Sequence, residues 1–341
     1  MTTYFIRRLL LIIPTFIGIT MISFILMHFV PGGPIERQIM AYKMAAAEQG
    51  GASLGNFGTE ISPEAIEQMK KFYGFDKPVI VRYGLWLWNI VHLDLGTSYI
   101  YQDPVWDVIK SRFPISIFLG LTGFLLSYVV CVPLGVVKAV RHGSRFDFFS
   151  SVLVFLGYAV PGWALGTALL VLFGGGSFLN LFPLGGFRPD GWEYLTVWGK
   201  ITGQLHHMAL PVFCYMVGAF ATETILTKNS LMENLGQDYV RTAFAKGLSE
   251  RRVIFVHALR NSLIPLVTGL GHAISLILAG SFLIERVFNI DGMGYLGYNA
   301  ILQRDYPVAL GILVISSLLM LVGNILSDIL YALVDPRIRF R

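Results

Sequence analysis

Long apolar segments constrain the fold of this chain more than any other feature. An α-helix rises about 1.5 Å per residue, so about 20 apolar residues cross a hydrocarbon core of roughly 30 Å. Six stretches meet that requirement: residues 9–30, 115–140, 148–173, 208–226, 263–284 and 308–334. Because a chain in lipid must satisfy its backbone hydrogen bonds internally, the sequence predicts an all-α polytopic membrane protein with six transmembrane helices.

The composition agrees with a membrane protein and argues against a nucleic-acid-binding one. Of the 341 residues, 55% are hydrophobic and 14% are charged, whereas soluble domains have about 25% charged residues. The net charge of +5 comes from basic residues at the ends of apolar segments, so no nucleic acid is expected as a partner. Cys131 and Cys214 lie inside apolar segments, which predicts small core side chains rather than a disulfide or metal site.

The distribution of Lys and Arg predicts that both termini are cytoplasmic. With the N-terminus inside, the cytoplasmic ends and loops carry fourteen Lys and Arg, and the short outer loops carry four. Residues 1–30 are then the N-terminus and the first span, which we expect to stay attached. Residues 31–114 form an extracytoplasmic insertion with short helices, one beginning at Pro63 and an interfacial one within residues 83–96. Residues 115–341 form the core membrane domain, with a cytoplasmic elbow at residues 229–262.

Motifs for catalysis and nucleotide binding are missing from the sequence. There is no G-x-x-x-x-G-K-[ST] phosphate loop, no H-E-x-x-H zinc motif and no G-x-S-x-G nucleophile elbow. The adjacent His206 and His207 are interpreted as an interfacial pair in preference to a metal site. We therefore expect no catalytic residue, no metal and no cofactor bound by this chain.

Two carboxylates, Glu223 and Asp328, lie inside predicted spans, where a charge suggests function by default. Both stand near the cytoplasmic ends of their helices, and Lys228 is close to the i+4 spacing that would pair with Glu223. A structural ion pair or a helix–helix contact is the favoured interpretation for each. A role in proton or substrate transfer is the alternative.

The elbow sequence DYVRTAFAKGLSERRVIFVHALRN, residues 238–261, combines basic residues with an apolar stripe. Placed on a helix, Val240, Ala243, Phe244, Gly247 and Leu248 follow the spacing i, i+3, i+4, i+7 and i+8, so they form one apolar stripe. Gly247 predicts either a turn between two short helices or a close approach of another backbone. Ser249 is a candidate N-cap for the second helix, from Glu250 toward Asn261. This helix-turn-helix elbow suits a partner protein or an anionic lipid surface, and the pattern alone does not choose between them.

At these residues the chain resembles the inner-membrane permease subunits of ABC importers for dipeptides and oligopeptides. Their cytoplasmic signature begins E-A-A-x-x-x-G and, in the peptide branch, is similar to RTARAKG…HALRN…P; here it is RTAFAKGLSERRVIFVHALRNSLIP. Arg241 and Thr242 occupy the Glu and first Ala positions, whereas Ala243 and Gly247 match. Other similar segments are FIRRLLLIIPTF, MHFVPGGP, ERVFNIDGMGYLGYNAILQRDYPVALG and LVDPRIRF, although Asp291-Gly292 replaces the usual Pro-Gly pair.

The resemblance implies a type I ABC importer permease fold in the bacterial inner membrane. It implies a B-type subunit that pairs with a second homologous permease, two ATPase subunits that hold ATP and Mg, and an extracytoplasmic peptide-binding protein. Oligopeptides, including antibiotics such as microcin C, would be the substrates. The elbow would be the coupling helix, with the apolar stripe as its docking surface for an ATPase. The residues expected to couple are Val240, Arg241, Thr242, Ala243, Phe244, Lys246, Gly247, Leu248, Ser249 and Glu250.

Two other function classes compete with this interpretation. A self-sufficient ion-coupled secondary transporter or channel would use Glu223 or Asp328, but it leaves the long cytoplasmic elbow without a purpose. An intramembrane enzyme would require a nucleophile and a base, and the sequence offers no such constellation.

Overall fold

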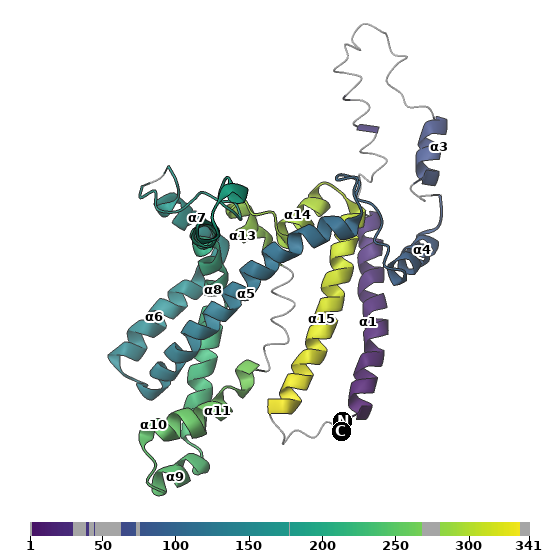
Figure 1. Cartoon of the computed structure of the whole chain (residues 1–341). Coiled ribbons are helices and arrows are strands. Elements are labelled where there is room, and N and C mark those ends of the chain that lie inside the picture. The colour runs from purple at the N-terminus through teal and green to yellow at the C-terminus, as the bar shows by residue number, and fades with distance from the viewer. Residues whose placement is uncertain are drawn as a thin grey trace. The chain divides into compact units, whose positions relative to one another are not determined.

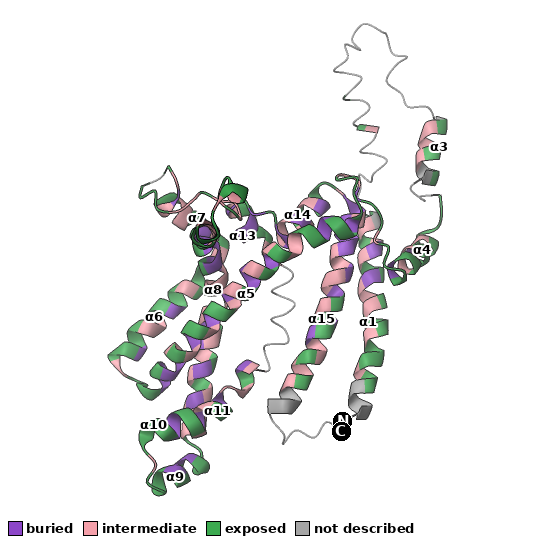
Figure 2. Ribbon diagram, viewed as in Figure 1, coloured by how far each residue is buried: buried purple, intermediate pink, exposed green. Residues whose placement is uncertain are grey.

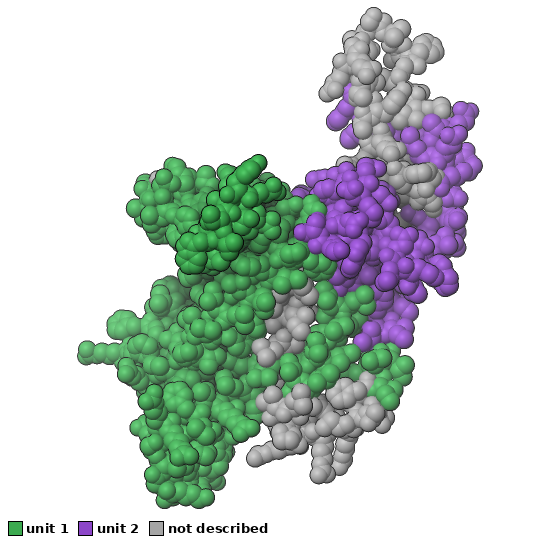
Figure 3. All heavy atoms as spheres, viewed as in Figure 1, with its two compact units in different colours: residues 1–10, 112–296, 318–341 green, residues 11–111, 297–317 purple. Residues whose placement is uncertain are grey.

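The computed structural model describes residues 2–29, 39–40, 44, 63–72, 76–176, 178–267 and 280–334 (Figure 1). Within these ranges the regular structure is helical, apart from isolated β-bridges such as the one between Thr97 and Pro104. The chain divides into two compact units, shown in Figure 3. One comprises residues 1–10, 112–296 and 318–341, and the other residues 11–111 and 297–317.

The first helix and the residues that precede the second span belong largely to the smaller unit. Helix α1 (Thr2–Phe29) covers the first predicted span, and α3 (Pro63–Phe72) begins at the predicted proline. Helix α4 (Val79–Val91) is apolar but too short to cross a membrane, as predicted. It packs on α1, because the Tyr83 hydroxyl lies 3.0 Å from Thr20 Oγ1 and donates to the Ile17 carbonyl.

A buried carboxylate organises the loop after α4. Asp305 accepts a hydrogen bond from the Ser98 hydroxyl and another from the Tyr99 amide at 3.1 Å. Ser98 Oγ in turn accepts from the Tyr101 amide at 2.9 Å. The loop therefore has an ordered polar core although it contains no helix or strand.

The larger unit contains long helices that extend beyond the predicted spans. Helix α5 (Val105–Val140) begins ten residues before the predicted start at 115, and α8 (Val197–Leu235) extends past both ends of residues 208–226. Helix α15 (Tyr306–Val334), which continues from the smaller unit, matches the last predicted span. The shorter helices are η1 (Trp192–Tyr194), α13 (Phe282–Val287) and α14 (Met293–Leu302).

The third predicted span, residues 148–173, is not one helix. It is a pair, α6 (Arg145–Ala159) and α7 (Gly162–Phe173), bent by 97° at the break (Figure 1). Val160 is extended, since the residue before a proline is disfavoured in the α conformation, and Pro161 caps α7. Among the described residues, four helices are long and apolar enough to span a membrane, or five if the bent pair is one span. The fifth predicted span includes residues 268–279, which lie outside the described residues.

The segment from residue 280 to 296 is anchored by a second buried carboxylate, Glu285. Its side chain accepts hydrogen bonds from Ser116 and Tyr215 and from the Tyr295 amide, the last at 2.7 Å. Burial raises the pKa of Glu285, and these hydrogen bonds offset only part of the rise. The hydrogen bonds of Glu285 join this segment to α5 and α8.

The departure from the family pattern at Asp291 has a structural partner. Arg112 Nη2 lies 2.9 Å from the Asp291 carboxylate, and Arg112 Nε donates to it at 3.1 Å. This ion pair connects the turn after α13 to α5.

Candidate functional site: the elbow after helix α8

The predicted helix-turn-helix elbow is present. It comprises α9 (Asp238–Ala245), a turn, α10 (Glu250–Arg252), the π-helix η2 (Val253–Ala258) and α11 (Leu259–Ser262). In Figure 1, α9 and α10 lie beyond the end of α8. The elbow predicted at residues 229–262 therefore starts later than expected, because α8 continues to Leu235.

Gly247 forms the turn. Its φ is +76°, a left-handed conformation that glycine adopts without steric cost. The turn is closed by hydrogen bonds from the Gly247 amide to the Phe244 carbonyl (2.9 Å) and from the Leu248 amide to the Ala243 carbonyl (3.3 Å). A Cβ at Gly247 would meet no described atom within 4 Å. Gly247 was predicted to allow either a turn or the close approach of another backbone. Within this chain, it is the turn that requires glycine.

The second arm of the elbow is less regular than predicted. Ser249 stands at the N-cap position of α10, but its side chain makes no capping hydrogen bond. The helical turns then widen into η2, and Val253 and Ala258 are fully buried there. π-Turns inside helices occur frequently at functional sites.

Three members of the predicted stripe, Val240, Ala243 and Leu248, face inward, which corrects part of the predicted docking surface. Val240 is fully buried and Ala243 nearly so, both within a core that contains residues of α5, α8 and η2. Leu248 packs against the same core. The stripe therefore fixes α9 to its own chain, and the prediction that it forms the docking surface is wrong for Val240 and Ala243. We call this group the elbow core; its buried members are Val136, Ala139, Leu231, Val240, Ala243, Val253 and Ala258.

The remaining residues of α9 and of the turn form an exposed, basic and partly aromatic face (Figure 2), which includes Phe244 although it was predicted on the stripe. Phe244 is 45% exposed and Tyr239 is 39% exposed. Arg241 forms an ion pair with Asp238 at 3.5 Å, but both side chains are so exposed that the pair contributes little stability. The predicted coupling residues on this face are Arg241, Thr242, Phe244, Lys246, Gly247, Ser249 and Glu250.

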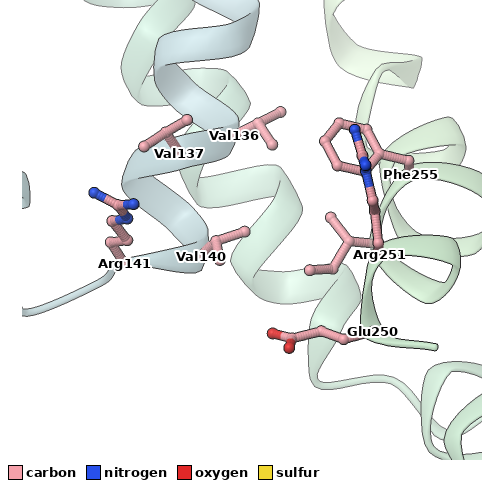
Figure 4. A pocket seen from close by; sticks show the side chains of 8 residues that line it. Val136, Val137, Val140, Arg141, Glu250, Arg251 and Phe255 are labelled. Carbon is pink, nitrogen blue, oxygen red and sulfur yellow. The ribbon is translucent and has the colours of Figure 1, made fainter.

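A groove of about 350 Å³ separates the end of α5 from the second arm of the elbow (Figure 4). Val136 and Val140 project from α5 toward it, while Arg251 and Phe255 lie on the opposite wall. Val140 and Phe255 remain exposed.

The charged residues of the predicted spans have partners, but not all the expected ones. Glu223 accepts a hydrogen bond from Ser127 of α5, which is the predicted helix–helix contact. Lys228 does not pair with Glu223; it binds Asp147 of α6 with distances of 2.7 and 2.8 Å. Asp328 forms an ion pair with Arg8 of α1.

The sequence interpretation missed a buried charged cluster around Asp147. Lys138 and Lys228 both bind its carboxylate, and Lys138 is only 1% exposed. The signal was present, because Lys138 lies inside the second predicted span, where an ionisable residue is rare. Its charge also fits the topology rule, which predicts an orientation and no partner.

The two adjacent histidines contact different backbone oxygens. His206 Nε2 lies 2.7 Å from the Leu181 carbonyl and His207 Nδ1 lies 3.3 Å from the Gly186 carbonyl. In the described part of the chain, no three His, Cys, Asp or Glu side chains gather in a way that could hold a metal ion.

Comparison with known families gives one match. Residues 131–340 match the family described as "Binding-protein-dependent transport system inner membrane component". The matched region contains the elbow, the Asp147 cluster and Glu285.

Individual relatives cover the whole chain. A protein of Agrobacterium fabrum, named peptidoglycan transport system permease protein YejB, is 42% identical over 100% of this chain and 99% of its own length. The inner membrane ABC transporter permease protein YejB of Escherichia coli O157:H7 is 41% identical with the same coverage. The oligopeptide transport system permease protein AppB of Bacillus subtilis is 36% identical over 100% of both chains.

Proposed function

Because the chain belongs to the family of inner-membrane components of binding-protein-dependent transport systems, we propose that it is the B-type permease subunit of an ATP-driven oligopeptide importer. It is a multi-pass inner-membrane protein and a non-catalytic subunit. The proposal assigns it half of the translocation pathway, with a second homologous permease supplying the other half. Two ATPase subunits would hold ATP and Mg, and an extracytoplasmic binding protein would deliver the peptide.

The exposed face of the elbow is the main observation that supports coupling of this chain to an ATPase. Phe244 and Tyr239 offer apolar anchors, while Arg241 and Lys246 offer positive charge. Aromatic residues and Arg dominate the binding energy of protein interfaces. We place this face in the cytoplasm, because the Lys and Arg distribution puts both termini and the elbow on the inner side.

The elbow transmits the state of the ATPases in this scheme. ATP binding closes the ATPase pair, moves the elbow and favours the permease conformation that faces outward; hydrolysis and release reverse the change. ATP can shift this equilibrium only as far as its affinities for the two states differ. The elbow must therefore bind its ATPase in both states and move with it.

Peptides are the proposed substrate class. The names of the relatives include peptidoglycan, oligopeptide and dipeptide transport, and the last is that of DppB of Escherichia coli, which is 36% identical. Short peptides, including peptide fragments of peptidoglycan, share a backbone that a binding protein can recognise. Microcin C, a peptide antibiotic, is a candidate for the same route.

Substitutions at Gly247 test the coupling role. The variant Gly247→Trp places a bulky side chain on the turn, whereas Gly247→Asn is a matched control because Asn tolerates a positive φ. We expect Gly247→Trp to abolish peptide uptake and peptide-stimulated ATP hydrolysis at normal expression, and Gly247→Asn to retain most of both. Uptake by Gly247→Trp at the unmutated level would refute docking at the elbow.

The alternative of an ion-coupled secondary transporter is tested in the same system. Its candidate residues Glu223 and Asp328 are engaged by Ser127 and Arg8. Peptide uptake by the permeases alone, driven by an ion gradient without ATPase subunits, would establish this alternative and overturn the proposal.

A further inference from the structure

Three helices meet at one buried carboxylate near the end of α5. Lys138 of α5 has its Nζ 3.1 Å from Asp147 Oδ1, and it donates to the Asp147 carbonyl at 3.0 Å. It also donates to Ser150 Oγ at 2.9 Å and Ser151 Oγ at 2.7 Å. All of these acceptors belong to α6, so Lys138 fixes the end of α5 to the first turns of α6.

The same carboxylate binds α8. Lys228 Nζ donates to Asp147 Oδ1 at 2.8 Å and to Oδ2 at 2.7 Å. The Gly143 amide also donates to Oδ2, at 3.2 Å, and the exposed His142 ring lies 3.3 Å from it. Two lysines therefore share one aspartate in a site largely closed to water, where ionic interactions are strong and an unpaired charge is costly.

The Asp147 cluster is continuous with the elbow core. Lys138 lies between Val136 and Ala139, which are elbow-core residues of α5, and Lys228 lies one helical turn before Leu231, the elbow-core residue of α8. The two helices also approach closely here, because a Cβ at Gly135 would lie 2.6 Å from Thr227 Cβ. Any displacement of the elbow core therefore acts on the two lysines directly.

The Asp147 cluster connects helix α6 to the elbow core. Among the described residues, the buried members of the elbow core come from α5, α8, α9 and η2 and none comes from α6. Helix α6 leads through the 97° bend at Pro161 into α7, which packs on α8 and α13. A firm link at the start of α6 is thus a mechanical connection between the elbow and the bent helix pair.

We propose that Asp147 is a positioning residue for coupling, which joins the first turn of α6 to the elbow through Lys138 and Lys228. This rests on the proposed role of the elbow in binding an ATPase. In this role Asp147 acts through the two lysines rather than by contact with ATP, peptide or an ATPase, and it passes movement of the elbow to α6 and α7.

The main test uses Lys228→Met in the complete transporter, reconstituted in lipid with its ATPases and binding protein. This variant removes the ion pair between α6 and α8 and leaves Asp147 and Lys138 as a balanced pair, so no buried charge is left without a partner. The readout is the ratio of peptide transported to ATP hydrolysed. We expect this ratio to fall about fivefold or more, the lower end of typical coupling between sites, while assembly and basal ATP hydrolysis are retained.

Two further variants complete the test. Asp147→Asn removes the shared carboxylate and is expected to lower the same ratio at least as much. Asp328→Asn is the matched control, because it removes a partly buried carboxylate that pairs with Arg8 rather than with a residue of the elbow helices. We expect it to leave the ratio unchanged.

Several outcomes would overturn the proposal. An unchanged ratio in Lys228→Met would do so, and so would a proportional loss of transport and hydrolysis, which indicates a purely structural role. If Asp147→Asn fails to fold, the ratio measured with Lys228→Met still decides between the two outcomes. Failure of the proposed docking can be distinguished from failure of this proposal. Docking is tested by measuring how tightly the Phe244→Ala variant binds the ATPase, and that measurement does not depend on either lysine.

Discussion

Replacing Phe244 with alanine should weaken association with the ATPase and leave the permease itself intact. A phenylalanine buries roughly 150–250 Å² when it is fully covered. Phe244 is 45% exposed. Docking would therefore cover about 70–110 Å² more of it, which at about 25 cal/mol per Å² corresponds to roughly 1.8–2.8 kcal/mol, or about 20-fold to 100-fold in affinity.

Val240→Ala is the matched control, because Val240 faces inward and is fully buried in the elbow core. It removes two methyl groups at about 0.8 kcal/mol each, so roughly 1.6 kcal/mol of stability is lost before any cavity cost. We expect this variant to lower the thermal midpoint of the permease, whereas Phe244→Ala should not.

The assay titrates purified ATPase subunits onto permease heterodimers in lipid nanodiscs and records the dissociation constant beside the thermal midpoint of each variant. The reasoning is refuted if Phe244→Ala binds the ATPase with unaltered affinity. It is equally refuted if Val240→Ala weakens binding while its thermal midpoint stays the same, since the inward stripe would then be the docking surface.

Three further substitutions test the contacts between helices. Gly135→Val should lower the thermal midpoint by the equivalent of about 1–3 kcal/mol, the usual cost of overpacking, because a Cβ there would lie 2.6 Å from Thr227 Cβ and 2.9 Å from the Thr224 carbonyl oxygen; an unchanged midpoint would contradict the close approach. Glu285→Gln should gain stability relative to the unmutated protein as pH rises above 4.5, the ordinary pKa of the carboxyl, because burial raises its pKa in the folded state and ionisation then opposes folding; thermal midpoints at acidic and alkaline pH measure this, and a constant difference would count against it. Glu223→Gln should retain peptide uptake, because its side-chain carbonyl can still accept the hydrogen bond from Ser127; complete loss of uptake in an assembled complex would indicate a role in transport.

The long helices could be predicted from the sequence because lipid leaves the backbone few alternatives. Apolar length alone located α1, α5, α8 and α15. The bend between α6 and α7 could not be located in this way, since a proline within an apolar run fits both a kinked span and a broken one. Which of the two forms depends on where the freed carbonyl groups find partners, and that is set by neighbouring helices.

At the elbow, the sequence predicted the two arms and the turn but not the direction of the stripe. Hydrophobic period shows that one face of α9 is apolar, and it does not show what covers that face. The partner of Lys228 was missed for a similar reason. Spacing along one helix suggested Glu223, whereas Asp147 is brought to Lys228 by the packing of α6 on α8.

The inward stripe changes what ATPase binding has to accomplish. Because Val240 and Ala243 are already buried in the elbow core, the elbow holds its shape through its own chain, and no ordering cost falls on the docking step. The exposed face then needs only a few anchors, since the binding energy is not spent on folding α9. A preformed elbow that is also tied to α6 through Asp147 moves as one body with the ends of α5 and α8. In the proposed mechanism, the free energy of ATP binding would then be available for shifting the permease between its two states rather than for assembling the part that receives it.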